Sequence, residues 1–126
     1  MMRFITAVLV IVTVNARALP VRFDLRENAK FPTYGRARVA GQVPTPPWRL
    51  TPTVAALKRA ILDRGPVMTA MRAKCEAGSV NQLMVLVGWD DRERTWIARS
   101  TWGSESYVRI AYDCNGIGSM AQYLKY

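Results

Sequence analysis

The chain has 126 residues, the length of one domain and no more. It carries 18 lysines and arginines against 9 acidic residues, a net charge of +9, and it has no histidine. The absence of histidine excludes Ser-His and Cys-His catalysis within the chain, because both mechanisms use an imidazole as the base. A Ser-Lys pair remains available in principle, but no spacing in the sequence singles one out.

The first residues have the pattern of a secretory signal peptide. Arg3 is followed by an apolar run over 4–14, and residues 16–18 form a small-x-small cleavage pattern. The run is short for a bilayer span, and a buried strand or an uncleaved anchor would also fit it. The sequence therefore predicts a signal peptide over 1–18 and a single exported domain, secreted or periplasmic, over 19–126. No later segment is long and apolar enough to cross a membrane.

Cys75 and Cys114 are the only cysteines in the sequence. An even pair in an exported chain predicts a disulfide, and closing a loop of this size stabilises a fold by about 4 kcal/mol on the chain-entropy model. The alternative is that Cys75 is a free thiol that acts as a nucleophile. Two isolated cysteines without histidine make no metal-ligand cluster, so we expect no metal ion and no cofactor.

Residues 19–52 read as extended chain and turns, followed by one helix. Prolines in "PTPPW" and "TP" forbid a long helix there, and residues 36–43 fit a short strand that stops at the first of them. The helix is predicted over 53–64, capped by Thr51 or Thr53 and stopped by a Gly-Pro pair. Its core-facing stripe is Val54, Leu57 and Ile61.

The remainder of the chain alternates strand patterns with turns. The predicted strands are 66–73, 83–89, 95–101 and 106–112. The continuously apolar stretch 83–89 fits a strand buried on both faces, and a polar turn joins it to 95–101 as a hairpin. Val108 and Ile110 fall on one side of the fourth strand, and residues 114–126 read as a Gly-rich turn and a short closing segment. One helix packed on an antiparallel sheet predicts an α+β domain.

Several short motifs follow one another in a distinctive order. They are "LPVRFDLRE" (19–27), "ALKRAILDRGPV" (56–67), Cys75, "NQLMVLVGW" (81–89), "ARSTWG" (98–103), "SYVRI" (106–110) and "CNGIG" (114–118). From the helix onward this order resembles the C-terminal, β-rich half of papain-like cysteine peptidases, the peptidase C1 family. The resemblance implies a papain-like right-hand domain, a small antiparallel sheet or half-barrel with one main helix. It also implies a disulfide, since both cysteines fall where the family has a bridge.

The same resemblance implies that the catalytic machinery is missing. The family's nucleophile opens a helix in the first half of the enzyme, and no segment here corresponds to that helical domain. Gln82 stands where the family has its catalytic histidine, and an amide cannot take up a proton near neutral pH. Ser100 replaces the asparagine that orients the histidine, whereas Trp102, which shields that pair in the family, is retained.

The resemblance also implies a substrate pocket that survives only in part. Ala70, Asn81 and Leu83 are the expected remnants of that pocket. Leu83 replaces a small residue that lines the pocket for the second substrate side chain, so its side chain partly fills the pocket. The cleft is thus expected to lack one wall, the catalytic pair and part of the specificity pocket.

The predicted function is that of an exported papain-like peptidase homologue that is catalytically inactive, a pseudopeptidase or remnant. Its candidate partners are a peptide or protein ligand, or a second copy bound through the face that the missing half would cover. A second hypothesis is a small cationic secreted protein that binds anionic surfaces, because removal of residues 1–18 leaves a net charge of +7. A half-enzyme that needs a partner chain, and a decayed gene, are two further hypotheses. The basic residues are scattered, so no specific nucleic-acid binding is predicted.

Overall fold

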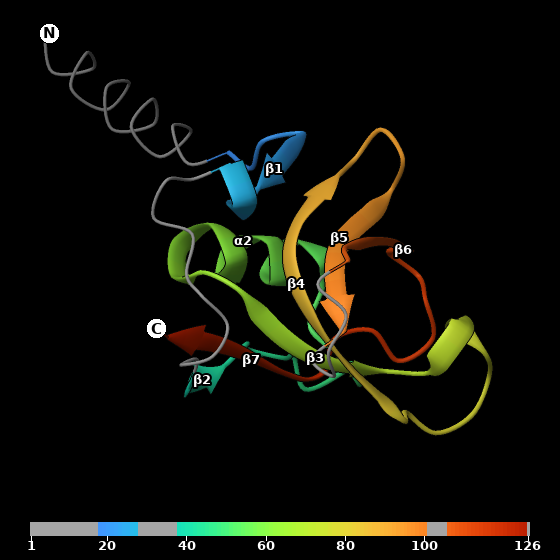
Figure 1. Ribbon diagram of the computed structural model, residues 1–126. Coiled ribbons are helices and arrows are strands. Elements are labelled where there is room, and N and C mark those ends of the chain that lie inside the picture. Colours follow the sequence, from blue (N-terminus) through green and yellow to red (C-terminus); the bar gives the residue numbers. More distant parts are fainter. Residues whose placement is uncertain (1–17, 28–37, 101–105, 126) are drawn as a thin grey trace, which may run out of the picture.

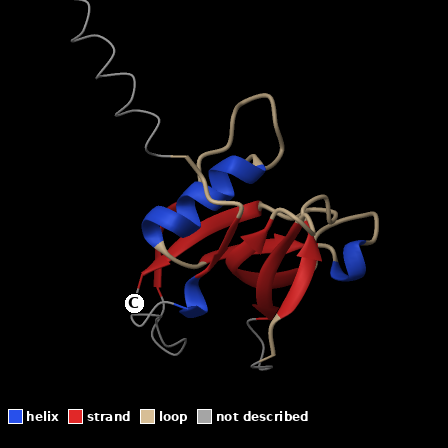
Figure 2. Cartoon of the chain, turned by 90° about the horizontal axis from the view of Figure 1, so that it is seen from above, coloured by secondary structure: helices blue, strands red, loops and turns tan. Residues whose placement is uncertain are grey.

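Seven antiparallel strands and one α-helix make up the part of the chain that the computed structural model describes, residues 18–27, 38–100 and 106–125 (Figure 1). The strands are β1 (Arg22–Asp24), β2 (Arg38–Gln42), β3 (Val67–Met71), β4 (Gln82–Asp90), β5 (Thr95–Ser100), β6 (Val108–Ala111) and β7 (Ser119–Lys125). They form one sheet in the order β2-β7-β3-β4-β5-β6, and β1 pairs with β4. The helix, α2 (Val54–Arg64), lies across this sheet (Figure 2). The predicted α+β class is confirmed. The predicted signal peptide lies outside the described residues, apart from its last position.

Helix α2 begins and ends where the sequence predicts. Thr53, and not Thr51, is the N-cap, because its hydroxyl oxygen accepts a hydrogen bond from the backbone N–H of Ala56 at 3.0 Å. Gly65 ends the helix with a φ of 121°, a value that favours glycine, and its N–H donates to two carbonyls of the last turn. Leu57 and Ile61 are buried against the sheet, so the predicted apolar face is the packed one.

Strand β4 is the longest strand and lies in the centre of the sheet. Its residues from Met84 to Asp90 are all buried, which confirms the prediction of burial on both faces. It pairs with β3 from Gln82 to Leu86 and with β5 over the predicted hairpin. In the edge strand β6, Ile110 is buried while Val108 is about half exposed (47%), so only part of the expected apolar side is covered.

The chain after Cys114 contributes a strand that the sequence did not predict. Two short turns lead into β7, which lies between β2 and β3 and pairs with both. Ala121 and Leu124 are buried on this strand, and its outward-facing residues border the cavities described below. The tail is therefore an inner strand of the sheet and not a surface appendage.

A disulfide joins Cys75 and Cys114, whose Cα atoms are 4.7 Å apart. It ties η3 (Ala73–Cys75), the short 3₁₀ helix after β3, to the turn after β6. The predicted pairing is confirmed, and no free cysteine remains to act as a nucleophile. Because the bridge closes a loop of sequence separation 39, it constrains the unfolded chain substantially.

A buried lysine fastens α2 to the turn between β4 and β5. Lys58 donates to Asp91 at 2.5 Å from its Nζ, and the Tyr112 hydroxyl donates to the same carboxylate oxygen at 2.5 Å. Burial raises the pKa of Asp91, but the hydrogen bonds from Lys58 and Tyr112 outweigh it and hold that pKa below its usual range. Burial and the hydrogen bond to Asp91 raise the pKa of Tyr112. The Lys58 ammonium also lies over the Trp89 ring, 5.6 Å from its centroid.

Candidate binding cleft

The start of β4 and the end of β3 bring four of the expected site residues together. The antiparallel register places Ala70 opposite Leu83, so Gln82 and Asn81 follow at the same end of the strand pair. Together with Val80 and Met120, these four side chains line a cavity of about 140 Å³. The sequence-derived pocket residues therefore do converge on one small hollow, which we call the cleft.

Ser100 lies near this group but outside the cavity. It pairs with Met84 across the β4–β5 ladder, and because strand side chains alternate, Gln82, Met84 and Ser100 project from one face. The side-chain amide of Gln82 donates to the Met84 sulfur at 3.5 Å. The remaining expected residue, Trp102, falls outside the described residues.

A larger hollow of about 370 Å³ adjoins the first and shares Leu83 and Met120 with it. Its other walls come largely from β7 and from residues 42–50, for which the sequence predicts extended, proline-rich chain. Leu50 and Met120 are both exposed, and neither was predicted as a site residue. Met120 reaches the cleft only because β7 inserts beside β3, so no local signal in the sequence identifies it.

The lining of the cleft and the adjoining hollow contains no titratable side chain. Its polar groups are amides and one hydroxyl, contributed by Gln42, Thr45, Asn81, Gln82 and Gln122. Such groups donate and accept hydrogen bonds at any physiological pH but cannot carry protons between reactants. The surface is therefore suited to binding an uncharged, largely apolar group.

The groups with shifted pKa values lie at the other end of β4. Hydrogen bonds from Arg92 lower the pKa of Asp90, at the last position of that strand. Burial alone would raise the pKa of Asp24, but hydrogen bonds from Arg26 outweigh it and lower that pKa. These carboxylates take part in ion pairs within the fold, away from the cleft. Where the structure describes the chain, no three metal-ligating side chains gather at one place.

Comparison with models of known protein families gives no match, and comparison with curated protein sequences gives none either. Within the described ranges, none of the helical segments has both the length and the apolar character needed to cross a bilayer.

Proposed function

We propose that this chain is an exported homologue of papain-like cysteine peptidases that has no peptidase activity and binds peptide in the cleft at the start of β4. In this proposal, the sheet with its single helix is the right-hand β domain of that family, standing without the helical nucleophile domain. The order of the motifs in the sequence supports the family assignment. The disulfide supports export to an oxidising compartment.

The proposed lack of peptidase activity rests on one observation, which is that no side chain lining the cleft can act as a base. Gln82 borders the cavity where an enzyme of this family would hold its base, and no lining residue titrates. Both cysteines of the chain are in the disulfide, and the sequence has no histidine. A nucleophile and a base are each required for acyl transfer, and this chain supplies neither in the usual form.

The class of ligand follows from the floor and the rim of the cleft. Leu83 and Met120 connect the two adjoining hollows into one apolar strip. The amide side chains of Asn81 and Gln122 belong to the lining. The Asn81 Oδ1 accepts from the Ala73 backbone N–H, so its NH₂ group and the Gln122 amide can pair with the C=O and N–H groups of an extended peptide. We expect a peptide with uncharged, apolar side chains to bind and an acidic or basic one to be rejected.

An activity assay tests the catalytic half of this proposal. The purified, disulfide-bonded chain is incubated with fluorogenic dipeptidyl substrates, with and without a thiol reductant. We expect no hydrolysis above the blank in either condition, because no imidazole is present to act as base. Thiol-dependent hydrolysis that E-64 abolishes would refute the assignment as an inactive homologue.

A binding titration tests the other half. Acetyl-Leu-Leu-Ala amide and acetyl-Glu-Glu-Ala amide are titrated into the chain and followed by amide chemical shifts. The apolar peptide is expected to bind with shifts around Leu83, and Met120→Lys to weaken it about tenfold by placing a charge in the cleft. Val108→Lys adds the same charge on β6 and should leave binding unchanged. Equal effects of the two variants, or tighter binding of the acidic peptide, would rule out the cleft as the site.

A further inference from the structure

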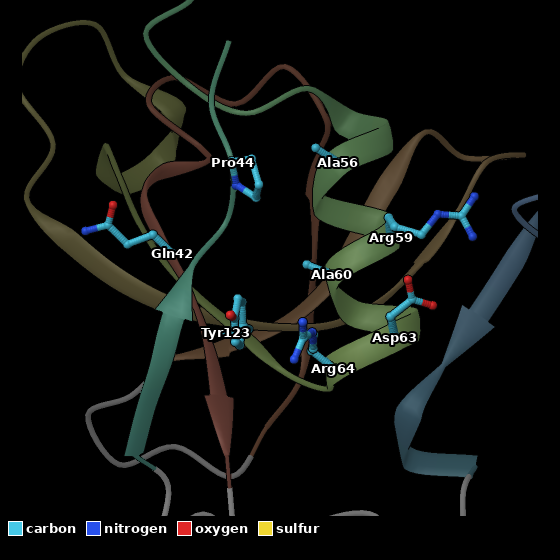
Figure 3. A pocket seen from close by; sticks show the side chains of 8 residues that line it. All are labelled: Gln42, Pro44, Ala56, Arg59, Ala60, Asp63, Arg64 and Tyr123. Atoms are coloured by element: carbon cyan, nitrogen blue, oxygen red, sulfur yellow. The ribbon is translucent and has the colours of Figure 1, made fainter. Parts of the chain in front are cut away.

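A separate cavity of about 290 Å³ lies between α2 and the β2–β7 edge of the sheet, and we call it the helix groove (Figure 3). It shares Gln42 alone with the hollows described above. Figure 3 shows Ala56 and Ala60 projecting from the helix toward the segment that follows β2, with Pro44 on the other side. These small apolar side chains leave space between the helix and Pro44 that an apolar group can enter.

The floor of the helix groove is the ring of Tyr123, and the backbone of β2 fixes its place. Gly41 pairs with Tyr123 across the β2–β7 ladder. A Cβ atom at Gly41 would stand 2.2 Å from the tyrosine hydroxyl oxygen, so only glycine lets the ring lie against the strand in this way. The guanidinium of Arg64 lies 5.1 Å from the ring centroid, beside the ring in Figure 3.

Two further cations stand on the same face as this ring. Arg38 and Lys125 are directly opposite each other in the β2–β7 register. Lys125 is two residues beyond Tyr123 on β7, so both side chains project from one face of the strand. Like charges directly opposite each other destabilise a strand pair, so Arg38 and Lys125 repel each other.

No acidic side chain offsets this cluster within the described part of the chain. The ion pairs found there involve other basic residues, and none includes Arg38, Arg64 or Lys125. Asp63 also borders the groove, but Figure 3 shows it together with Arg59 on the flank of the helix turned away from Tyr123. Arg64 thus lines the helix groove, and Arg38 and Lys125 follow beyond Tyr123 on the same face of the β2–β7 pair.

We propose that the helix groove binds a small organic anion, with a planar apolar body between α2 and Tyr123 and a carboxylate or phosphate group beside Arg38, Arg64 and Lys125. Arginine forms paired hydrogen bonds to either acidic group, and the anion would relieve the repulsion between the opposed cations. The volume is near the lower end for small-molecule sites, which matches a ligand with one aromatic ring. This site is independent of the peptide-binding function proposed for the cleft.

A titration with phenyl phosphate tests the proposal, using the full disulfide-bonded chain and amide chemical shifts. Benzyl alcohol supplies the ring without the charge, and inorganic phosphate supplies the charge without the ring. We expect saturable shifts at Ala56, Ala60 and Tyr123, and binding of phenyl phosphate at least about tenfold tighter than that of either fragment. Binding of inorganic phosphate as tight as that of phenyl phosphate would overturn the proposal, since the apolar part of the groove would then contribute nothing.

Charge-matched variants locate the site. Arg64→Gln and Lys125→Gln should each weaken phenyl phosphate at least about fivefold, because each removes a cation beside the acidic group. Arg92→Gln removes the same charge in the turn after β4 and should change the affinity less than about twofold. If Arg64→Gln perturbs the fold, the exposed Lys125→Gln variant decides the question. An equal loss with Arg92→Gln would show that net charge alone attracts the anion and would overturn the site.

Discussion

At the scale of single residues, Gly88 determines how the N-terminal strand joins the sheet. Strand β1 pairs with β4 beyond the end of β3, with Asp24 opposite Gly88. A Cβ atom at this glycine would lie 2.2 Å from the carbonyl oxygen of Phe23 and 2.9 Å from the Cα of Asp24. The neighbouring Trp89 completes the attachment by donating from its ring nitrogen to the Pro20 carbonyl at 3.0 Å. The close approach of the two backbones therefore depends on the missing side chain.

Gly88→Ala should consequently displace β1 and lower the free energy of unfolding by about 1–3 kcal/mol, the usual cost of overpacking a core. Gly41→Ala is the matched control, because its Cβ atom would meet the far end of the Tyr123 side chain, which can rotate. We expect a smaller loss for the control. Urea unfolding followed by tryptophan fluorescence measures both, and an equal loss would contradict the role given to backbone contact at Gly88.

At the scale of elements, the features that local patterns specify were predictable from the sequence, and those that depend on distant pairing were not. The helix and the β4–β5 hairpin follow from apolar spacing and from turn residues, and their positions agree with the prediction. Strand β7 lacks such a pattern, because its buried residues Ala121 and Leu124 are three apart, and its ladder with β3 contains a register shift. The role of Met120 could not be predicted for the same reason.

Helix α2 depends on the turn after β4 through the Lys58–Asp91–Tyr112 cluster. Hydrogen bonds in this cluster hold the pKa of Asp91 below its usual range in the folded chain, although burial acts in the opposite direction. The stabilisation is thus present above the ordinary pKa near 4 and is lost as the pH falls through the lower folded value. The docking of the helix should therefore weaken in acid.

Asp91→Asn tests this link between elements. At neutral pH we expect it to lower the free energy of unfolding by about 1 kcal/mol, a figure kept small because the carboxylate is more than a third exposed. The difference from the original chain should shrink as the pH falls below about 4, since protonation then removes the same charge. Unfolding curves at several pH values measure it, with Asp113→Asn, which removes an exposed carboxylate outside the cluster, as the control. A difference independent of pH would contradict the assignment.

At the scale of the whole molecule, the two ends of β4 differ in chemistry. One end holds the carboxylates Asp90 and Asp91, which are engaged in ion pairs. The other begins at Gln82, beside a cleft without a titratable lining. Shifted pKa values often mark catalytic sites, and here they mark contacts that hold the fold together. In the proposed function, the ion pairs at one end of β4 stabilise the fold, and the cleft at the other end binds peptide.

Removal of the disulfide tests how far the cleft depends on that loop. The double variant Cys75→Ala, Cys114→Ala should lose up to about 4 kcal/mol of stability, because the bridge spans a sequence separation of 39. The stretch 75–114 that it closes contains Val80 and Asn81 of the cleft lining, so affinity for the apolar peptide should fall as well. Phenyl phosphate binding in the helix groove should persist, since none of that lining belongs to the stretch 75–114.

Urea unfolding measures the stability, and the two titrations measure the affinities. Reductant should lower the stability of the original chain but not that of the variant. Loss of both affinities under conditions where the variant is folded would show that the two sites are coupled, contrary to this expectation.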